Sequence, residues 1–236
     1  MSLQKRLKAV IDKIISKIKK AFIPGRQISD CTRLIYDIMN ALDHQNLPGL
    51  IMLIDFEKAF DSVSWKFLYD VLHFFGFNEE LIKWIKLFNE DFTLYVSQCG
   101  FLSTEIPIGR GCRQGDPISS YLFILGAQIL TLLILTDPKV VGFKTKTQEY
   151  KLTQFADDTT LILDGQLNSL QAALNILEIF GNISGLRMNK EKTKVIWLGR
   201  KKHSKEKLKV SVQLDWGCER FKLLGITFDV DLMLYS

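Results

Sequence analysis

The stretch Tyr150–Leu163 (YKLTQFADDTTLIL) places two adjacent carboxylates, Asp157 and Asp158, between two apolar runs. The runs have the composition of strands, so the stretch predicts a tight hairpin with two anions at its tip. Adjacent like charges repel each other, and Mg²⁺ would remove that repulsion because it prefers carboxylate oxygens as ligands. A solvated turn is the other interpretation of an Asp-Asp pair. The rest of the chain decides between them.

The bulk composition is that of an ordinary globular protein. The 236 residues are enough for one or two domains with a full core, and 47% of them are hydrophobic and 24% charged. The net charge of +5 permits an anionic partner such as nucleic acid without requiring one. The four cysteines are scattered with no CxxC pair, which argues against a zinc or disulfide framework and suits a reducing compartment.

Two segments raise the question of a membrane. Residues 3–22 carry apolar side chains at helical spacing and a lysine-rich opposite face, which predicts an amphipathic helix packed on a neighbouring domain or lying on a membrane surface. Ile118–Thr136 has no charge and is about long enough to span a bilayer. It starts directly after Pro117, and proline in the first turn is a normal start for a helix of a soluble protein. A helix that is apolar on all sides can also be buried in a core. We expect a core helix, no stable membrane association and no secretion signal.

Helices and strands alternate irregularly, with hairpins among them, so the predicted fold class is α+β. Leu50–Ile54 is a continuous apolar run and predicts a buried central strand, and residues 92–106 predict a hairpin. The other predicted elements are a helix capped by Ser29 or Asp30 and ending near Leu42, helices at Trp65–Phe75 (capped by Ser64), 79–89 and 168–184 (capped by Asn168), and strands near 193–198, 208–212 and 221–224.

Asp55 follows the central strand directly. A strand can present such a residue at the edge of a sheet, beside a hairpin tip that carries Asp157 and Asp158. Three carboxylates converging from two elements could hold two Mg²⁺ ions roughly 3.5–4 Å apart, the arrangement used for in-line displacement at phosphorus.

Six segments, in this order, resemble the motifs of the reverse transcriptase domain of non-LTR (LINE-type) retrotransposons. They are Ala21–Arg26 for the fingers motif, Leu53–Val63 for palm motif A, Arg113–Ser119 for motif B, Phe155–Asp158 for motif C, Gly185–Thr193 for motif D and Phe221–Ile226 for motif E, the primer grip. The resemblance covers nearly the whole chain. It implies an α+β right-hand polymerase palm with an antiparallel sheet and packed helices. It also implies an RNA-directed DNA polymerase that joins dNTPs to the 3′-hydroxyl of a DNA primer on an RNA template, with two Mg²⁺ ions for which Mn²⁺ can substitute.

The resemblance implies roles for the three aspartates and for two neighbours of Asp55. Asp55, Asp157 and Asp158 would be the catalytic carboxylates and the metal ligands, with Asp158 the weaker ligand. Phe56 would offer its backbone carbonyl to a metal. Phe60 would be a steric gate against a ribose 2′-hydroxyl and so favour deoxynucleotides; by residue type alone it is a core aromatic.

Four further residues would contact the nucleotide or template. In the motif B loop, Gln114 is favoured over Arg113, and Gly115 lets the backbone approach a ligand closely. Arg26 would reach the triphosphate or template, since guanidinium binds phosphate in bidentate fashion; simple solvation is the alternative. Lys192 stands where a family lysine protonates the leaving pyrophosphate.

Two features remain at the C-terminal end. By the resemblance, Leu224 and Gly225 would belong to the primer grip. The basic stretch 187–209, which contains Trp197, would either track the backbone of a primer–template duplex or be a solvated, lysine-rich loop.

The resemblance also divides the chain and leaves rival functions open. Because a thumb holds the duplex, we expect weak primer–template binding and poor processivity from a chain without a complete thumb. One rival is a truncated nucleic-acid-binding module that retains the fold without useful catalysis, and another is a membrane-associated protein built around residues 118–136. An intracellular location, nuclear and/or cytoplasmic as for retroelement ribonucleoproteins, is expected. The expected parts are partial fingers (1–48), palm with motif A (49–90), hairpin and motif B loop (91–117), palm with motifs B to D (118–206) and primer-grip hairpin (207–236).

Overall fold

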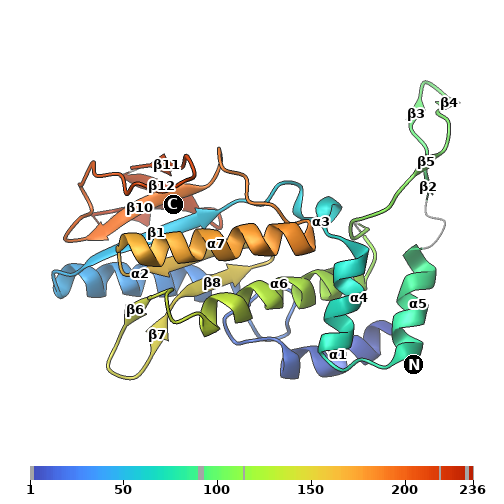
Figure 1. Ribbon diagram of the computed structural model, residues 1–236, viewed down its shortest axis with the longest axis horizontal. Helices are drawn as coiled ribbons and strands as arrows, with labels where there is room; N and C mark the ends of the chain where they lie inside the picture. Colours follow the sequence, from blue (N-terminus) through green and yellow to red (C-terminus); the bar gives the residue numbers. More distant parts are fainter. Residues whose placement is uncertain (1–2, 90–92, 114, 218, 232–233, 236) are drawn as a thin grey trace.

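A five-stranded sheet carries the fold in the computed structural model, which describes residues 3–89, 93–113, 115–217, 219–231 and 234–235 (Figure 1). All neighbouring strands are antiparallel except β10 and β11, which are parallel. The predicted central strand is confirmed, because β1 lies between β10 and β9. The strand order is β11 (Asp215–Trp216), β10 (Lys194–Gly199), β1 (Pro48–Ile54), β9 (Asp158–Leu163) and β8 (Leu152–Phe155).

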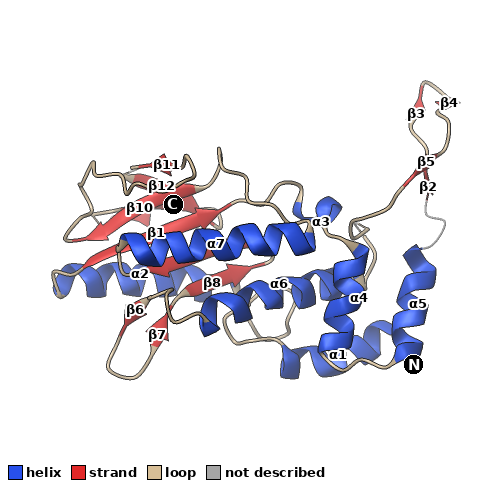
Figure 2. Cartoon of the chain, viewed as in Figure 1, coloured by secondary structure: helices blue, strands red, loops and turns tan. Residues whose placement is uncertain are grey.

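Side chains that alternate along the strands fill two cores, one on each face of the sheet. On β1, Leu50, Met52 and Ile54 join the larger core, whereas Ile51 belongs to the smaller one. Figure 2 shows α6 and α7 running along one face, with α2 on the other. The helices are α1 (Leu3–Ile14), α2 (Ile28–His44), α3 (Ala59–Ser62), α4 (Trp65–Phe74), α5 (Glu79–Asn89), α6 (Ser119–Thr136) and α7 (Leu167–Ser184).

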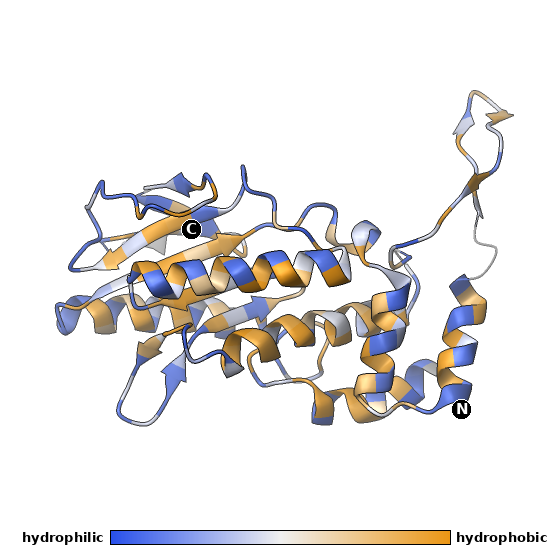
Figure 3. Cartoon of the chain, viewed as in Figure 1, coloured by the Kyte–Doolittle hydropathy of each residue, from blue (hydrophilic) through white to orange (hydrophobic). Residues whose placement is uncertain are grey.

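Helix α6 is the core helix that its composition predicts. By length and composition it could cross a membrane, but 67% of it is buried inside the protein. It packs against α1, α4 and α7, and Figure 3 shows it as a predominantly apolar element. Its side chains therefore contribute to the larger core.

Smaller sheets and hairpins extend from this body. The predicted hairpin near Cys99-Gly100 is confirmed as a projecting arm of two strand pairs (Figure 1). The motif E segment lies in a second sheet, and Phe221, Leu223 and Phe228 of that sheet join the smaller core. The strands are β2 (Thr93–Leu94) with β5 (Ile106–Pro107), β3 (Ser97–Gln98) with β4 (Phe101–Leu102), β6 (Phe143–Lys144) with β7 (Glu149–Tyr150), and β12 (Arg220–Leu223), β13 (Ile226–Asp229) and β14 (Leu234–Tyr235).

The N-terminal helix is shorter than its periodicity predicts, because α1 ends at Ile14. Beyond it the chain turns and passes beside β8, where Lys19 forms a bridge with Gln154. From residue 15 to residue 27 the chain forms turns and irregular structure, and Phe22 has φ +60°, which lies outside the range of a right-handed helix. The prediction of a helix through residue 22 was therefore wrong.

Three other local predictions need correction. Helix α2 begins after Gln27 and α7 after Gln166, so the caps lie two or three residues before those expected. Residues 208–212 form no strand; their apolar side chains pack against the larger core as irregular chain, while the edge of the sheet is occupied by β11. The Ser64 cap is confirmed, because its hydroxyl accepts from the Phe67 amide.

Candidate active site

The register of β1 and β9 places Asp55 beside Asp158. Ile54 and Thr159 are the last pair of this ladder, and continuing its register by one residue would set Asp55 opposite Asp158. Residues that face each other across antiparallel strands have Cα atoms about 4.5–5.5 Å apart and side chains on the same face. Asp55 and Asp158 therefore lie on neighbouring strands at the end of β1, near enough for the charge of Asp55 to act on Asp158.

Asp157 stands at the tip of the adjoining hairpin. Phe155 pairs with Asp158, so the turn consists of Ala156 and Asp157. Ala156 has φ +53°, a left-handed conformation that alanine rarely adopts. Asp55, Asp157 and Asp158 are all exposed, and we call the group of these three carboxylates the catalytic edge.

The charges at the catalytic edge act on one another. Partial burial raises the pKa of Asp158, and the neighbouring charges of Asp157 and Asp55 raise it further. The repulsion expected of this group is therefore present in the fold. The donor set fits a hard divalent ion, which binds oxygen ligands. In the described part of the chain, however, no three His, Cys, Asp or Glu side chains are grouped closely enough to form a metal site.

The motif D segment holds the backbone of Asp55. The Asn189 amide donates to the Asp55 carbonyl (2.8 Å), and the Asp55 amide donates to the Thr193 hydroxyl (3.4 Å). The Glu57 amide donates to the Arg187 carbonyl (2.9 Å). Since Thr193 is fully buried, its hydrogen bond holds the backbone of Asp55 against the interior of the protein.

Phe56 and Phe60 both pack against core helices. Phe56 bridges to Met188, and its ring lies 6.5 Å from that of Phe180 in an edge-on contact. The half-buried Phe60 ring stacks on Phe123 of α6 with centroids 4.3 Å apart. Phe60 thus combines the core packing expected of an aromatic with partial exposure, and its role as a gate stays a prediction.

The motif B loop is attached to motif A. The Cys112 amide donates to the Phe60 carbonyl (2.6 Å), and the Trp65 indole donates to the Gly111 carbonyl (2.7 Å). The Arg113 guanidinium bonds to the carbonyl of Phe88 near the end of α5. Gln114 lies outside the described residues, so its predicted contact with the nucleotide stays a prediction.

Arg26 is placed differently from the expectation that it reaches a triphosphate or template. Its guanidinium is largely buried and forms an ion pair with Asp12 (2.6 Å). It also donates to the carbonyls of Ser16 and Lys19 (2.6 Å each) and Ile15 (3.4 Å). The planar fork that suits phosphate is here bonded to the turn after α1, so the geometry assigns Arg26 a structural role.

Lys192, Leu224 and Gly225 lie in turns. Lys192 is exposed, and its amide donates to the Asn189 side chain (3.2 Å). Leu224 and Gly225 join β12 to β13 and have φ values of +51° and +87°, as a type I′ turn requires. The predicted hairpin is confirmed, whereas a contact of these residues with substrate or primer stays a prediction.

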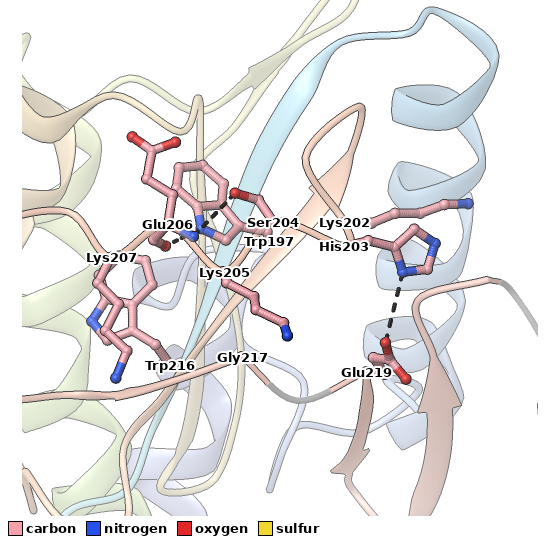
Figure 4. A pocket seen from close by; sticks show the side chains of 10 residues that line it. All are labelled: Trp197, Lys202, His203, Ser204, Lys205, Glu206, Lys207, Trp216, Gly217 and Glu219. Carbon is pink, nitrogen blue, oxygen red and sulfur yellow. Dashed lines mark hydrogen bonds and ion pairs between the residues drawn. The ribbon is translucent and has the colours of Figure 1, made fainter.

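The basic stretch does not present Trp197 to solvent. The Trp197 ring is buried, its indole donates to the Glu206 carbonyl (2.8 Å), and Lys201 lies 4.7 Å from its centroid. A cavity of about 490 Å³ opens beside it, with Lys205 and Trp216 among its lining residues (Figure 4). Trp197 is therefore a core residue, and stacking on a nucleic acid base is not open to it.

Lys19 is buried, although the lysine-rich face predicted for this segment puts its lysines in solvent. Only 2% of the residue is exposed, and burial lowers the pKa of its ammonium to about 7. Its Nζ is the one buried side-chain nitrogen or oxygen without a hydrogen-bond partner among the described residues. Residues 19–23 read Lys-Lys-Ala-Phe-Ile, with no alternation of polar and apolar types, so no local pattern marked Lys19 as buried.

Comparison with known proteins places these features in a family. A family model of reverse transcriptases (RNA-dependent DNA polymerases) matches residues 1–228. The chain is 28% identical over 190 residues to the transposon TX1 uncharacterized 149 kDa protein of Xenopus laevis, covering 80% of this chain and 14% of that one. It is 29% identical over 175 residues to the retrovirus-related Pol polyprotein from the type-2 retrotransposable element R2DM of Drosophila melanogaster, covering 74% and 16%. The chain thus spans less than a fifth of the length of either relative.

The fold has solved counterparts. A structure of telomerase from Candida tropicalis in complex with a fragment of telomeric RNA aligns with 99% of this chain and 36% of its own, at a TM-score of 0.68 and 13% identity. The corresponding complex from Candida albicans aligns at a TM-score of 0.58 and 15% identity, covering 98% and 37%. At these identities the likeness shows a shared fold, which is the α+β polymerase palm. The resemblance to non-LTR retrotransposon enzymes is confirmed by the relatives, and the chain belongs to the reverse transcriptase (RNA-dependent DNA polymerase) family.

Proposed function

We propose that this chain forms the catalytic palm of an RNA-directed DNA polymerase, which adds deoxynucleotides to the 3′-hydroxyl of a DNA primer on an RNA template. The observation that carries the proposal is the catalytic edge, where Asp55 follows the last pair of β1 with β9, Asp157 and Asp158 lie at the adjoining hairpin tip, and the charges of Asp55 and Asp157 act on Asp158. An RNA template is supported by the family and by the telomerase structures, whose titles name a telomeric RNA fragment.

Asp55, Asp157 and Asp158, with the Phe56 carbonyl, would hold two Mg²⁺ ions, for which Mn²⁺ can substitute. Bound there, the ions would make the 3′-hydroxyl a nucleophile and neutralise the triphosphate. The protein's own part is to hold these ligands in place. Thr193 and Asn189 hold the backbone of Asp55 by hydrogen bonds, which would limit the movement of its carboxylate when an ion binds.

The test is primer extension on an oligonucleotide-primed RNA template with Mg²⁺ and dNTPs. We expect Asp157→Asn to lower the rate by at least about 10³-fold, because metal stabilisation of the transition state contributes several kcal/mol. The matched control is Asp215→Asn, an exposed aspartate on β11 of the same sheet, which should retain activity. Equal activity in wild type and Asp157→Asn would refute the proposal. Binding of primer–template without extension in any variant would instead identify the nucleic-acid-binding module.

The preference for deoxynucleotides has its own test at Phe60. Removing the half-buried ring should admit a ribose 2′-hydroxyl, so we expect Phe60→Ala to raise ribonucleotide relative to deoxynucleotide incorporation by about 10–100-fold, the discrimination that shape alone provides. Phe60→Tyr keeps the ring and should keep the selectivity. The measurement is kcat/KM for each nucleotide class, and an unchanged ratio in Phe60→Ala would leave Phe60 as a core aromatic only.

A further inference from the structure

Three polar side chains connect helix α6 to the turn that carries Asp157. The Thr131 hydroxyl donates to Gln154 Oε1, and Gln154 Nε2 donates to the Thr159 hydroxyl (2.9 Å). The Thr159 hydroxyl donates in turn to the backbone carbonyl of Asp157 (3.5 Å). A continuous chain of hydrogen bonds therefore runs from the motif B helix to the hairpin tip of motif C.

This chain is closed off from water. The exposed fractions are 0% for Thr131 and 2% for both Gln154 and Thr159. Buried polar groups are expensive unless they are hydrogen-bonded, so each group depends on its neighbour in the chain. Gln154 serves as an acceptor at one end and a donor at the other, which an apolar side chain of similar length cannot do.

Gln154 is also held through its backbone. Its carbonyl accepts from the Lys20 amide (3.0 Å) and from the Cys31 thiol (3.8 Å). In the hairpin it faces Thr159 directly, so the bond between their side chains spans paired residues. Gln154, which connects α6 to the hairpin tip, is thus also held by residues near the N-terminus.

The turn needs such support. Ala156 occupies a left-handed conformation that costs an L-residue energy, and Asp157 and Asp158 repel each other beside it. We propose that Thr131, Gln154 and Thr159 are positioning residues, which hold the carbonyl of Asp157 and thereby keep its carboxylate at the catalytic edge. The inference rests on the proposed function, since it assigns these residues to the same site.

The kinetic test compares two threonines of one strand. Thr159 and Thr160 are adjacent on β9 and equally buried, at 2% exposure, but only Thr159 bonds to Gln154 and Asp157. We expect Thr159→Val to lower kcat for primer extension by about tenfold, the lower end of the range for residues that orient metal ligands, with KM for dNTPs unchanged. Thr159→Ser should restore the rate, and Thr160→Val should retain it.

A second readout is independent of activity. Amide hydrogen exchange at residues 155–158 should be about two- to tenfold faster in Thr159→Val than in Thr160→Val, which is the scale of one lost hydrogen bond. The affinity for Mn²⁺ alone, measured by paramagnetic resonance, should fall with it. Thr131→Val, at the far end of the chain of bonds, should show the same changes in weaker form and replaces Thr159→Val if that variant does not fold.

The outcomes separate the two proposals. Equal exchange and equal kcat in Thr159→Val and Thr160→Val would overturn the positioning role while leaving the polymerase intact. If Asp157→Asn extended primers as fast as the wild type, the proposed polymerase function would be refuted. The hydrogen-exchange comparison would still decide whether Thr131, Gln154 and Thr159 hold the turn. Loss of activity in Thr159→Ser equal to that in Thr159→Val would also contradict the inference, because the hydroxyl is then not the group that matters.

Discussion

The catalytic edge and the segment 15–26 both carry charged side chains in or beside family motifs, but the two regions use them in opposite ways. At the catalytic edge the carboxylates are exposed, and the groups that hold them, such as Thr193 and Thr159, are buried. In the segment 15–26 two of the cations, Lys19 and Arg26, turn inward. Arg26 is bonded to the turn after α1, and Lys19 is buried with no hydrogen-bond partner for its Nζ among the residues that the structure describes.

The difference teaches how a charge in a motif is to be interpreted. A charge that is exposed while its supporting groups are buried is available to a ligand, as at the catalytic edge. A charge that is itself buried contributes to the fold or costs it stability. The variants below test this contrast from the largest expected effect to the smallest.

Lys19→Met should give the largest effect, a gain in stability that depends on pH. Burial lowers the pKa of Lys19 from 10.5 to about 7, so the unfolded chain holds its proton over a range where the folded chain releases it. The cost is therefore complete below pH 7 and disappears as the pH rises to 10.5. Across that window the free energy of unfolding of the wild type should rise by about 1.4 kcal/mol per pH unit relative to Lys19→Met.

The measurement is chemical denaturation of both proteins at several pH values. Lys17→Met is the matched control, because Lys17 lies two residues away and is exposed. It should follow the wild type at every pH. If Lys19→Met were less stable than the wild type at neutral pH, the ammonium would have a favourable role, and the contrast between the two regions would fail.

Arg26→Ala should have the next largest effect, on stability rather than on nucleotide binding. The guanidinium bonds to Asp12 and to three carbonyls, and hydrogen bonds of charged groups contribute about 1.5–3 kcal/mol. We expect the free energy of unfolding to fall by about 2 kcal/mol, with KM for dNTPs unchanged. The control is Arg33→Ala, whose exposed pair with Asp37 should contribute less than about 0.5 kcal/mol. A raised KM with unchanged stability would return Arg26 to the nucleotide site.

The contrast also shows which parts of the molecule the sequence predicts. The strand before Asp55 and the hairpin carrying Asp157 follow from apolar runs in the sequence and from the order of the motifs. Their pairing fixes a register that ends at Ile54 and Thr159, and this register brings Asp55 close to the hairpin tip. This part of the site depends on backbone hydrogen bonds, which local patterns report well.

What the sequence did not predict depends on partners distant in the chain. Gln154 has the side chain of an ordinary surface residue, and only the approach of Thr131 from α6 makes it part of the site. Lys19 is buried because the segment after α1 passes beside β8. The motif and the residue type of Arg26 suggest a phosphate ligand. The carbonyls that it binds instead belong to the turn after α1, and the sequence did not show where α1 ends.

Asp158→Asn should give the smallest effect and tests the other side of the contrast. The pKa of Asp158 is raised by burial and by the charges of Asp157 and Asp55, so its ionisation costs the folded state stability. The free energy of unfolding is therefore higher at low pH, where the carboxyl is protonated, and it falls as the pH rises from the ordinary pKa of aspartate through the raised pKa of Asp158. Removing the charge should therefore stabilise the protein at neutral pH, by less than about 1 kcal/mol because the exposed carboxylate is screened by solvent.

The gain from Asp158→Asn should vanish below the ordinary aspartate pKa of 3.8, where the wild-type carboxyl is neutral in both states. Saturating Mg²⁺ should also remove or reverse it, because an ion that binds only the folded wild type stabilises that state by mass action. Thermal unfolding of both proteins with and without Mg²⁺ measures this. If Mg²⁺ left the difference unchanged, the repulsion among the three carboxylates would serve no metal, and the exposed charges of the catalytic edge would be a solvated turn.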